Sequence, residues 1–253
     1  MPEQFSPLYV FIHIPKTGGT TISGHLRNEL DWDVEFVHLG PWGEDYRARN
    51  NLTPFADRPE EVRMQARVLA GHDATADIDA LVPGSSTRYL TFVRDPADRL
   101  VSVYNFRTSK PENADLSFED WYETVPPNPM FRWLRRRLNV TTMADLKDTL
   151  REFWFLGTTD HLDDDLPGVF AAIGVPTTWE NRRVIGSGAS SMTGLDHHDA
   201  DRVLTRQLTI DDELRDRIYT DHPKDLALYR FANKRRQRLL DRGVLDRTTT
   251  SAG

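Results

Sequence analysis

The chain has 253 residues, 38% of them hydrophobic, which is enough to bury the core of one large α/β domain. Its formal net charge of −7 argues against broad nucleic-acid binding, because such binding relies on a basic surface. The absence of cysteine excludes a disulfide framework, a zinc–thiolate site and a cysteine nucleophile.

Signals for membranes or export are not found in the sequence. No stretch has the apolar length of a transmembrane helix, and the first residues lack the basic and apolar regions of a signal peptide. We therefore expect a cytoplasmic protein with no membrane partner. Residues 1–240 are expected to form a single domain, followed by a flexible tail over residues 241–253.

The first predicted elements are a buried strand and a helix separated by a polar turn. Residues 8–12 form an apolar run rich in β-branched and aromatic side chains, which is typical of a buried strand. Apolar residues recur at helical spacing from Ile22 to Leu30, so a helix is predicted to begin near Thr20 or Thr21.

The turn between this strand and helix has the residue types that bind an anion. They are Lys16, Thr17, Gly18, Gly19, Thr20 and Thr21. Glycines let backbone N–H groups approach a phosphate, and the helix N-terminus adds positive potential. The hydroxyls add neutral donors and the lysine adds a point charge. The lysine precedes both glycines, so this is not a Walker A loop, and an ordinary tight turn is the alternative.

The remaining predicted elements alternate between strands and helices. Strands are predicted at 33–39, 66–73, 88–94 and 154–159, and helices at 59–64, from Pro96 after an Asp95 N-cap, from a Ser117–Asp120 capping box, and at 131–138, 143–153, 162–173, 199–222 and 223–240. Residues 42–58 are predicted to be loop with at most a short helix, and residues 177–193 an irregular loop. This alternation predicts an α/β fold with a mainly parallel central sheet flanked by helices.

Three predicted strand ends carry polar side chains: Lys16 with its glycines, His72 and Arg94. In an open α/β sheet the carboxyl ends of the strands share one crevice, so these residues are expected to meet there. Arg94 and Ser102 lie on one strand–helix unit and are suited to hold a phosphate, the arginine bidentately. The alternatives are an Arg94–Asp98 ion pair and an exposed Ser102.

Both segments resemble those of sulfotransferases that use 3′-phosphoadenosine 5′-phosphosulfate (PAPS). Residues 15–21, Pro-Lys-Thr-Gly-Gly-Thr-Thr, resemble the 5′-phosphosulfate loop, above all that of the carbohydrate O-sulfotransferase branch. Residues 94–104 resemble the 3′-phosphate-binding segment, R-x-P-x-x-R-x-x-S-x-Y. By this resemblance Arg94 and Ser102 bind the 3′-phosphate while Arg99 braces the site.

The resemblance also implies a fold, a co-substrate and a reaction. It implies a P-loop-like sulfotransferase fold, PAPS as co-substrate and PAP as product. It further implies a hydroxyl-bearing acceptor (a small molecule, a sugar or a biosynthetic intermediate) and no metal. Weaker similarity covers residues 155–162 and 225–229. An ATP-dependent kinase with an atypical phosphate loop and a non-catalytic nucleotide-binding protein are the alternatives, and the oligomeric state stays open.

Sulfuryl transfer needs charge stabilisation at the leaving oxygen and a base for the acceptor hydroxyl. Lys16 and the loop N–H groups are suited to the first task. His72 is the best candidate for the base, because an ordinary histidine pKa of about 6.5 suits proton transfer at neutral pH. Its place after a strand and a glycine resembles the Gly-His segment of carbohydrate 2-O-sulfotransferases. A loop-capping or Asp73-paired His72 is the alternative, with His38 as reserve base and Asp73 third.

Other polar residues receive weaker assignments. His13 is expected to pack within the first strand, and His197 and His198 to mark a helix start rather than a metal site. Residues 135–137 form either a charged helix face or a contact for an anionic acceptor. Arg182, Arg183 and Ser187 are candidates for a further phosphate contact.

Overall fold

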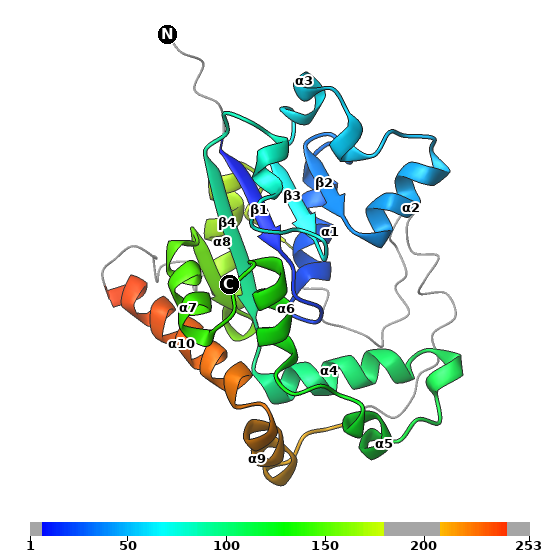
Figure 1. Ribbon diagram of the computed structural model, residues 1–253, viewed down its shortest axis with the longest axis vertical. Coiled ribbons are helices and arrows are strands. Elements are labelled where there is room, and N and C mark those ends of the chain that lie inside the picture. The colour runs from blue at the N-terminus through cyan, green and yellow to red at the C-terminus, as the bar shows by residue number, and fades with distance from the viewer. Residues whose placement is uncertain (1–6, 180–207, 242–253) are drawn as a thin grey trace.

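The computed structural model describes residues 7–179 and 208–241, and a five-stranded parallel sheet forms its centre (Figure 1). Its strands are β1 (Leu8–Ile12), β2 (Phe36–Leu39), β3 (Val68–Gly71), β4 (Thr87–Val93) and β5 (Phe155–Thr158). They lie in the order β2-β3-β1-β4-β5, and every pairing is parallel. The predicted α/β class with a parallel sheet is confirmed.

Helices cover both faces of the sheet. The helices of the described residues are α1 (Gly19–Glu29), α2 (Pro41–Arg49), α3 (Glu60–Arg63), α4 (Pro96–Thr108), α5 (Phe118–Glu123), α6 (Pro129–Arg137), α7 (Met143–Glu152), α8 (Leu162–Ile173), α9 (Asp212–Asp221) and α10 (Pro223–Asp241), with 3-10 turns at Phe55–Asp57, Ile78–Leu81, Pro111–Asn113 and Thr159–His161. One core cluster joins the sheet to α6, α7 and α10, and a second joins the opposite face to α1 and α8. β1 is central and buried along its whole length, which explains its unbroken apolar sequence.

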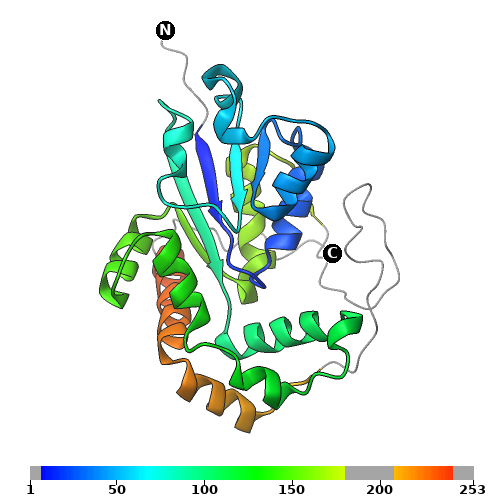
Figure 2. The same cartoon turned by 45° about the vertical axis from the view of Figure 1, so that its right-hand side comes forward.

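A third group of helices lies beyond the carboxyl ends of the strands. α4, α5 and α9 share their own apolar cluster, in which Leu100, Trp121 and Ile218 are buried. Figure 2 shows α4 running from the end of β4 beneath the turn that joins β1 to α1. This group therefore forms one side of the region in which the strand-end residues lie.

Some predicted boundaries differ from the structure. β2 begins at Phe36 instead of Asp33, because Asp33 has a positive φ of 65° in a turn held by the carbonyl of Asp31. α2 occupies about half of the segment 42–58 that was predicted as mainly loop. α9 begins at Asp212. Residues 208–211, which were predicted to be helical, are therefore not part of a helix.

Several predictions fall outside the described residues. They concern residues 1–6, most of the irregular loop 177–193, the first part of the helix predicted at 199–222, the tail after residue 241, and Arg182, Arg183, Ser187, His197 and His198. Among the helices that the structure describes, none has the length and apolar character to cross a membrane.

Candidate active site

The carboxyl ends of neighbouring strands bring the predicted polar residues to one edge of the sheet. His38 lies in β2, and His72, His13 and Arg94 directly follow β3, β1 and β4. These four strands are consecutive in the sheet order. The common edge expected from the sequence is therefore observed.

The turn between β1 and α1 has a special backbone. Lys16 has a φ of 68°, uncommon for a residue with a side chain, and Gly18 has a φ of 85°. Gly18 is also the N-cap of α1 and has no side chain with which to cap the helix. The N–H of Thr21 donates to the carbonyl of Gly18 at 3.1 Å. The N–H groups that precede it come before the first hydrogen bond of the helix, so they are suited to bind an anion.

The threonines of the turn differ in their surroundings. Thr17 is fully buried, and its hydroxyl donates a 2.9 Å hydrogen bond to the carbonyl of Ile14. Its side chain therefore supports the turn from inside, which leaves its backbone as the part suited to a phosphate. Thr20 is exposed and Thr21 half-buried in the first turn of α1.

The two predicted phosphate-binding segments contact each other directly. Arg94 donates from Nη1 to the carbonyl of Lys16 at 3.4 Å, and Arg99 donates from Nε to the carbonyl of Pro15 at 3.0 Å. The ammonium of Lys16 lies 4.4 Å from the ring centre of Phe106 in α4. The strand–helix unit of β4 and α4 thus holds successive residues of the β1–α1 turn.

Arg99 is buried, and its burial lowers the pKa of its guanidinium. The pKa of this group is about 10, because attraction from Asp225 offsets part of the effect of burial. Even so it stays protonated at neutral pH, so its contact with Pro15 is a charge-assisted hydrogen bond. Ser102, further along α4, is half-buried.

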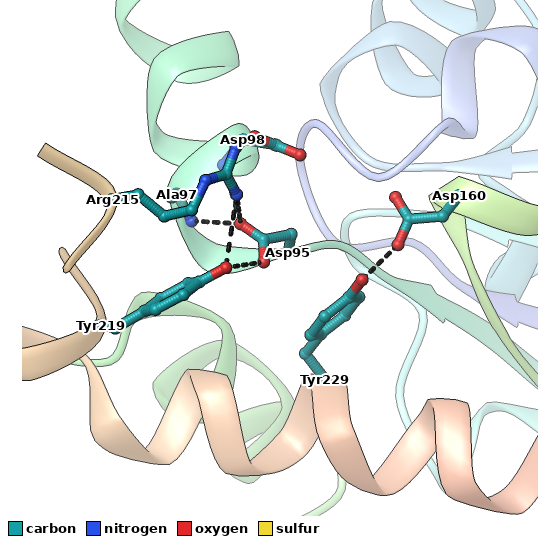
Figure 3. A network of polar contacts seen from close by, with 7 residues as sticks. All are labelled: Asp95, Ala97, Asp98, Asp160, Arg215, Tyr219 and Tyr229. Carbon is teal, nitrogen blue, oxygen red and sulfur yellow. Dashed lines mark hydrogen bonds and ion pairs between the residues drawn. The ribbon is translucent and has the colours of Figure 1, made fainter. Parts of the chain in front are cut away.

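Side chains of α9 hold the N-terminus of α4 in place (Figure 3). Asp95, the predicted N-cap, accepts hydrogen bonds from the backbone N–H groups of Ala97 and Asp98. It also accepts from Arg215 and Tyr219 of α9, and Arg215 forms a second ion pair with Asp98 at 2.8 Å. Arg215 and Tyr219 were not predicted as site residues; the signal for them was their i, i+4 spacing, which puts both side chains on one face of α9.

A similar contact ties the end of β5 to α10. The hydroxyl of Tyr229 donates to Asp160, next to β5 (Figure 3). The two segments of weaker family resemblance, residues 155–162 and 225–229, are therefore in contact.

His72 and His38 have different environments. His72 is half-buried, with its Nδ1 3.0 Å from the carbonyl of His13 and its ring packed against Trp133. His38 is buried between Trp32 and Trp42. Burial, with repulsion from His72 and two arginines, lowers the pKa of His38 to about 4.

His13 lies just after β1, not within it, and is buried as expected. Its ring stacks on that of His72, with ring centres 4.5 Å apart. Burial, followed by repulsion from His72, His38 and Lys16, lowers its pKa well below the ordinary value. A charged His13 ring is therefore disfavoured by its burial and by the neighbouring positive groups.

The arginines of α6 divide between two surroundings. Arg137 forms a 2.8 Å ion pair with Asp73 and lies over the ring of Trp133. Arg135 is exposed and lines a shallow groove with Arg132 and Lys224, apart from the strand-end residues. Within residues 7–179 and 208–241, no cluster of three or more His, Asp or Glu side chains is arranged to hold a metal ion.

Comparison with known proteins gives one family match and several matching solved structures. A family model described as the sulfotransferase family matches residues 8–232. A sulfotransferase from Alicyclobacillus acidocaldarius has 16% sequence identity and a TM-score of 0.42, over 87% of this chain and 93% of its own. Retinol dehydratase in complex with retinol and PAP has 16% identity and a TM-score of 0.43, over 89% and 82%. Mouse sulfotransferase SULT7A1 complexed with PAP has 10% identity and a TM-score of 0.39, over 85% and 64%. Among curated proteins, no sequence matches.

Proposed function

The chain belongs to the sulfotransferase family, whose model matches residues 8–232, and we propose that it transfers the sulfuryl group of PAPS to an acceptor hydroxyl. It is a sulfotransferase by this membership. PAPS as the donor, a hydroxyl as the acceptor and the roles of individual residues are the proposal.

The contact between the two phosphate-binding segments is the observation that carries the proposal. Arg94 and Arg99 donate to the carbonyls of Lys16 and Pro15, so the two segments are in direct contact. A nucleotide with phosphates at its 3′ and 5′ positions needs two anion sites at a fixed separation. The N-terminus of α1 with Lys16 supplies one, and Arg94 with Ser102 supplies the other.

The reaction assigns one task to each group. The acceptor oxygen bonds to sulfur as the bond between sulfur and the bridging oxygen of the 5′-phosphate breaks, and PAP leaves. Lys16 and the N–H groups of Gly18 and Gly19 stabilise the charge that develops on that oxygen. The acceptor proton passes to His72, which we favour over His38 because a base with a pKa of about 4 is weak at neutral pH.

Binding and turnover with three alanine variants test the proposal. We expect calorimetry to detect PAP binding that a chelator leaves unchanged, and labelled PAPS to transfer its sulfuryl group to members of a hydroxyl acceptor panel. Lys16→Ala should lower the transfer rate by about 10²–10³-fold, the usual cost of removing such a donor. His72→Ala should abolish transfer and retain PAP binding. Lys110→Ala is the matched control, because Lys110 also lies near the ring of Phe106.

Other results would favour the alternatives. Binding of ATP with magnesium in place of PAP would indicate a kinase. PAP binding without transfer to any acceptor would indicate a non-catalytic nucleotide-binding protein. Near-normal transfer by His72→Ala would remove His72 as the base.

A further inference from the structure

His13 and His72 are joined through both their main chain and their rings. The N–H of His13 donates to the carbonyl of Gly71 at 3.2 Å, extending the pairing of β1 with β3 by one residue. The next contact is formed by a side chain: Nδ1 of His72 lies 3.0 Å from the carbonyl of His13. Above this contact the two rings stack at 4.5 Å with an interplanar angle of 28°.

This contact determines which nitrogen of His72 carries a proton. A carbonyl oxygen only accepts hydrogen bonds, so Nδ1 of His72 must be the donor. In the neutral ring, Nε2 is then unprotonated and able to accept a proton. A free histidine side chain in water favours the opposite tautomer, so the contact with His13 selects the less common one.

The ring of His13 occupies space left by the absent side chain of Gly19. A Cβ placed on Gly19 would lie 1.9 Å from Nε2 of His13, far closer than atoms can approach. On its other sides, His13 stacks on Phe11 at 5.3 Å and on His72. The position of the His72 ring therefore depends on the first residue of α1, which belongs to the phosphate-binding turn.

The ring of His13, which lies between His72 and the β1–α1 turn, is uncharged, and the charged groups around His72 fit this state. His13 and His38 face it from the ends of β1 and β2, and both have lowered pKa values. Arg137 of α6 is paired with Asp73, the residue after His72. Burial favours the uncharged form of His13, so no imidazolium is placed against the His72 ring.

We propose that His13 is a positioning residue that holds His72 with its proton on Nδ1 and Nε2 as proton acceptor, and that Gly19 links this arrangement to the phosphate-binding turn. The role of His72 as base rests on the proposed function. As the bond between the acceptor oxygen and sulfur forms and the bond to the 5′-phosphate breaks, the acceptor proton passes to Nε2 of His72.

The tautomer of His72 can be measured without turnover. Long-range ¹H–¹⁵N spectra of the full chain with labelled histidine, assigned with His72→Gln, distinguish the two ring nitrogens. We expect a protonated Nδ1 and an unprotonated Nε2 at neutral pH. A proton on Nε2 with a bare Nδ1 would overturn the proposal. The tautomer measurement does not depend on the substrate. If PAPS proves not to be a substrate, only the proposed function is refuted.

Variants at His13 separate positioning from general packing. His13→Ala keeps the backbone carbonyl of residue 13 but removes the ring that stacks on His72 and holds its Nδ1 against that carbonyl. The freed His72 ring should therefore show a mixture of tautomers, and kcat should fall by about tenfold or more, with the PAP dissociation constant changed less than about threefold. His13→Phe, which keeps a stacking ring, should retain the single tautomer and most of kcat. An unchanged tautomer in His13→Ala, or equal damage by both variants, would overturn the proposal.

Glycine variants test the link to the turn. Gly19→Ala should displace His13 and mix the His72 tautomers, whereas Gly168→Ala in α8 is the control because its Cβ would meet no atom within 4 Å. If His13→Ala does not fold, the proposal is tested by the tautomer of His72 in the wild type and by the comparison of Gly19→Ala with Gly168→Ala. A single Nδ1–H tautomer in folded Gly19→Ala would refute the link.

Discussion

Replacement of Asp225 by asparagine should change how stability depends on pH. Asp225, in the first turn of α10, is buried, and its carboxylate oxygens accept 2.9 Å and 2.8 Å hydrogen bonds from the N–H groups of Met130 and Phe131 at the start of α6. Burial raises its pKa from 3.8 to about 6, although these bonds and Arg99 favour the charged form. The carboxyl group is therefore easier to protonate in the folded chain than in the unfolded one.

The magnitude follows from the difference between the two pKa values. A folded-state pKa above the unfolded value gives stability that is complete below about pH 3.8 and is lost as the pH rises through 6. The difference of about two pH units corresponds to about 3 kcal/mol, and roughly half of it falls between pH 5 and 7.5. The advantage of the wild type over Asp225→Asn should therefore be larger at pH 5 than at pH 7.5, by about 1.4 kcal/mol.

Denaturant unfolding at a series of pH values measures this difference. The buried residues His13, His38 and His222 have lowered pKa values and act in the opposite direction, since their stabilising neutral form is lost as the pH falls below about 6.5. The wild type and Asp225→Asn both contain these histidines, so their contribution cancels when the two unfolding free energies are subtracted. Replacing the exposed Asp57 with asparagine is the control. A wild-type advantage that is constant with pH, or larger at pH 7.5, would refute the reasoning.

Three further predictions concern nucleotide binding and packing. Arg94→Met should weaken PAP binding by about 10–150-fold, the value of a charged hydrogen bond of 1.5–3 kcal/mol, whereas calorimetry should find the exposed Arg107→Met unchanged. Gly157→Ala should lower unfolding free energy by about 1–3 kcal/mol, because its Cβ would lie 2.5 Å from an aromatic ring of β4; a wild-type melting curve would contradict this. Asp33→Asn should cost about 3 kcal/mol in denaturant unfolding, since it leaves two nearly buried arginines without their anion, and a loss below about 1 kcal/mol would show that the ion pairs contribute little.

The sheet and its strand ends could be predicted from the sequence because their signals are local. Each strand contains a short run of apolar residues and is followed by a glycine or a polar residue, and α4 begins at an Asp-Pro pair that fixes its N-cap. α2 was missed as a regular helix because Gly43 and Arg47 are its buried residues, so it has no apolar stripe.

The contacts that assemble the candidate site could not be predicted in this way. Arg99 and Pro15 are 84 positions apart, and Asp225 stabilises a helix that begins 96 positions before it. A side chain that binds a distant backbone group leaves no periodic pattern in either segment. The turn sequence suggested a phosphate ligand for Gly19, but the space that a side chain at this position would need is filled by the ring of His13, which the sequence only indicated as packed.

The shape of the turn between β1 and α1 and its charge depend on different atoms. Arg94 and Arg99 hold the turn by the carbonyls of Lys16 and Pro15, and Thr17 holds it by the carbonyl of Ile14. None of these contacts uses the side chain of Lys16, so alanine at this position retains all three. Loss of activity in Lys16→Ala would therefore report the missing ammonium group, whereas loss in a variant of Arg99 would report a deformed turn.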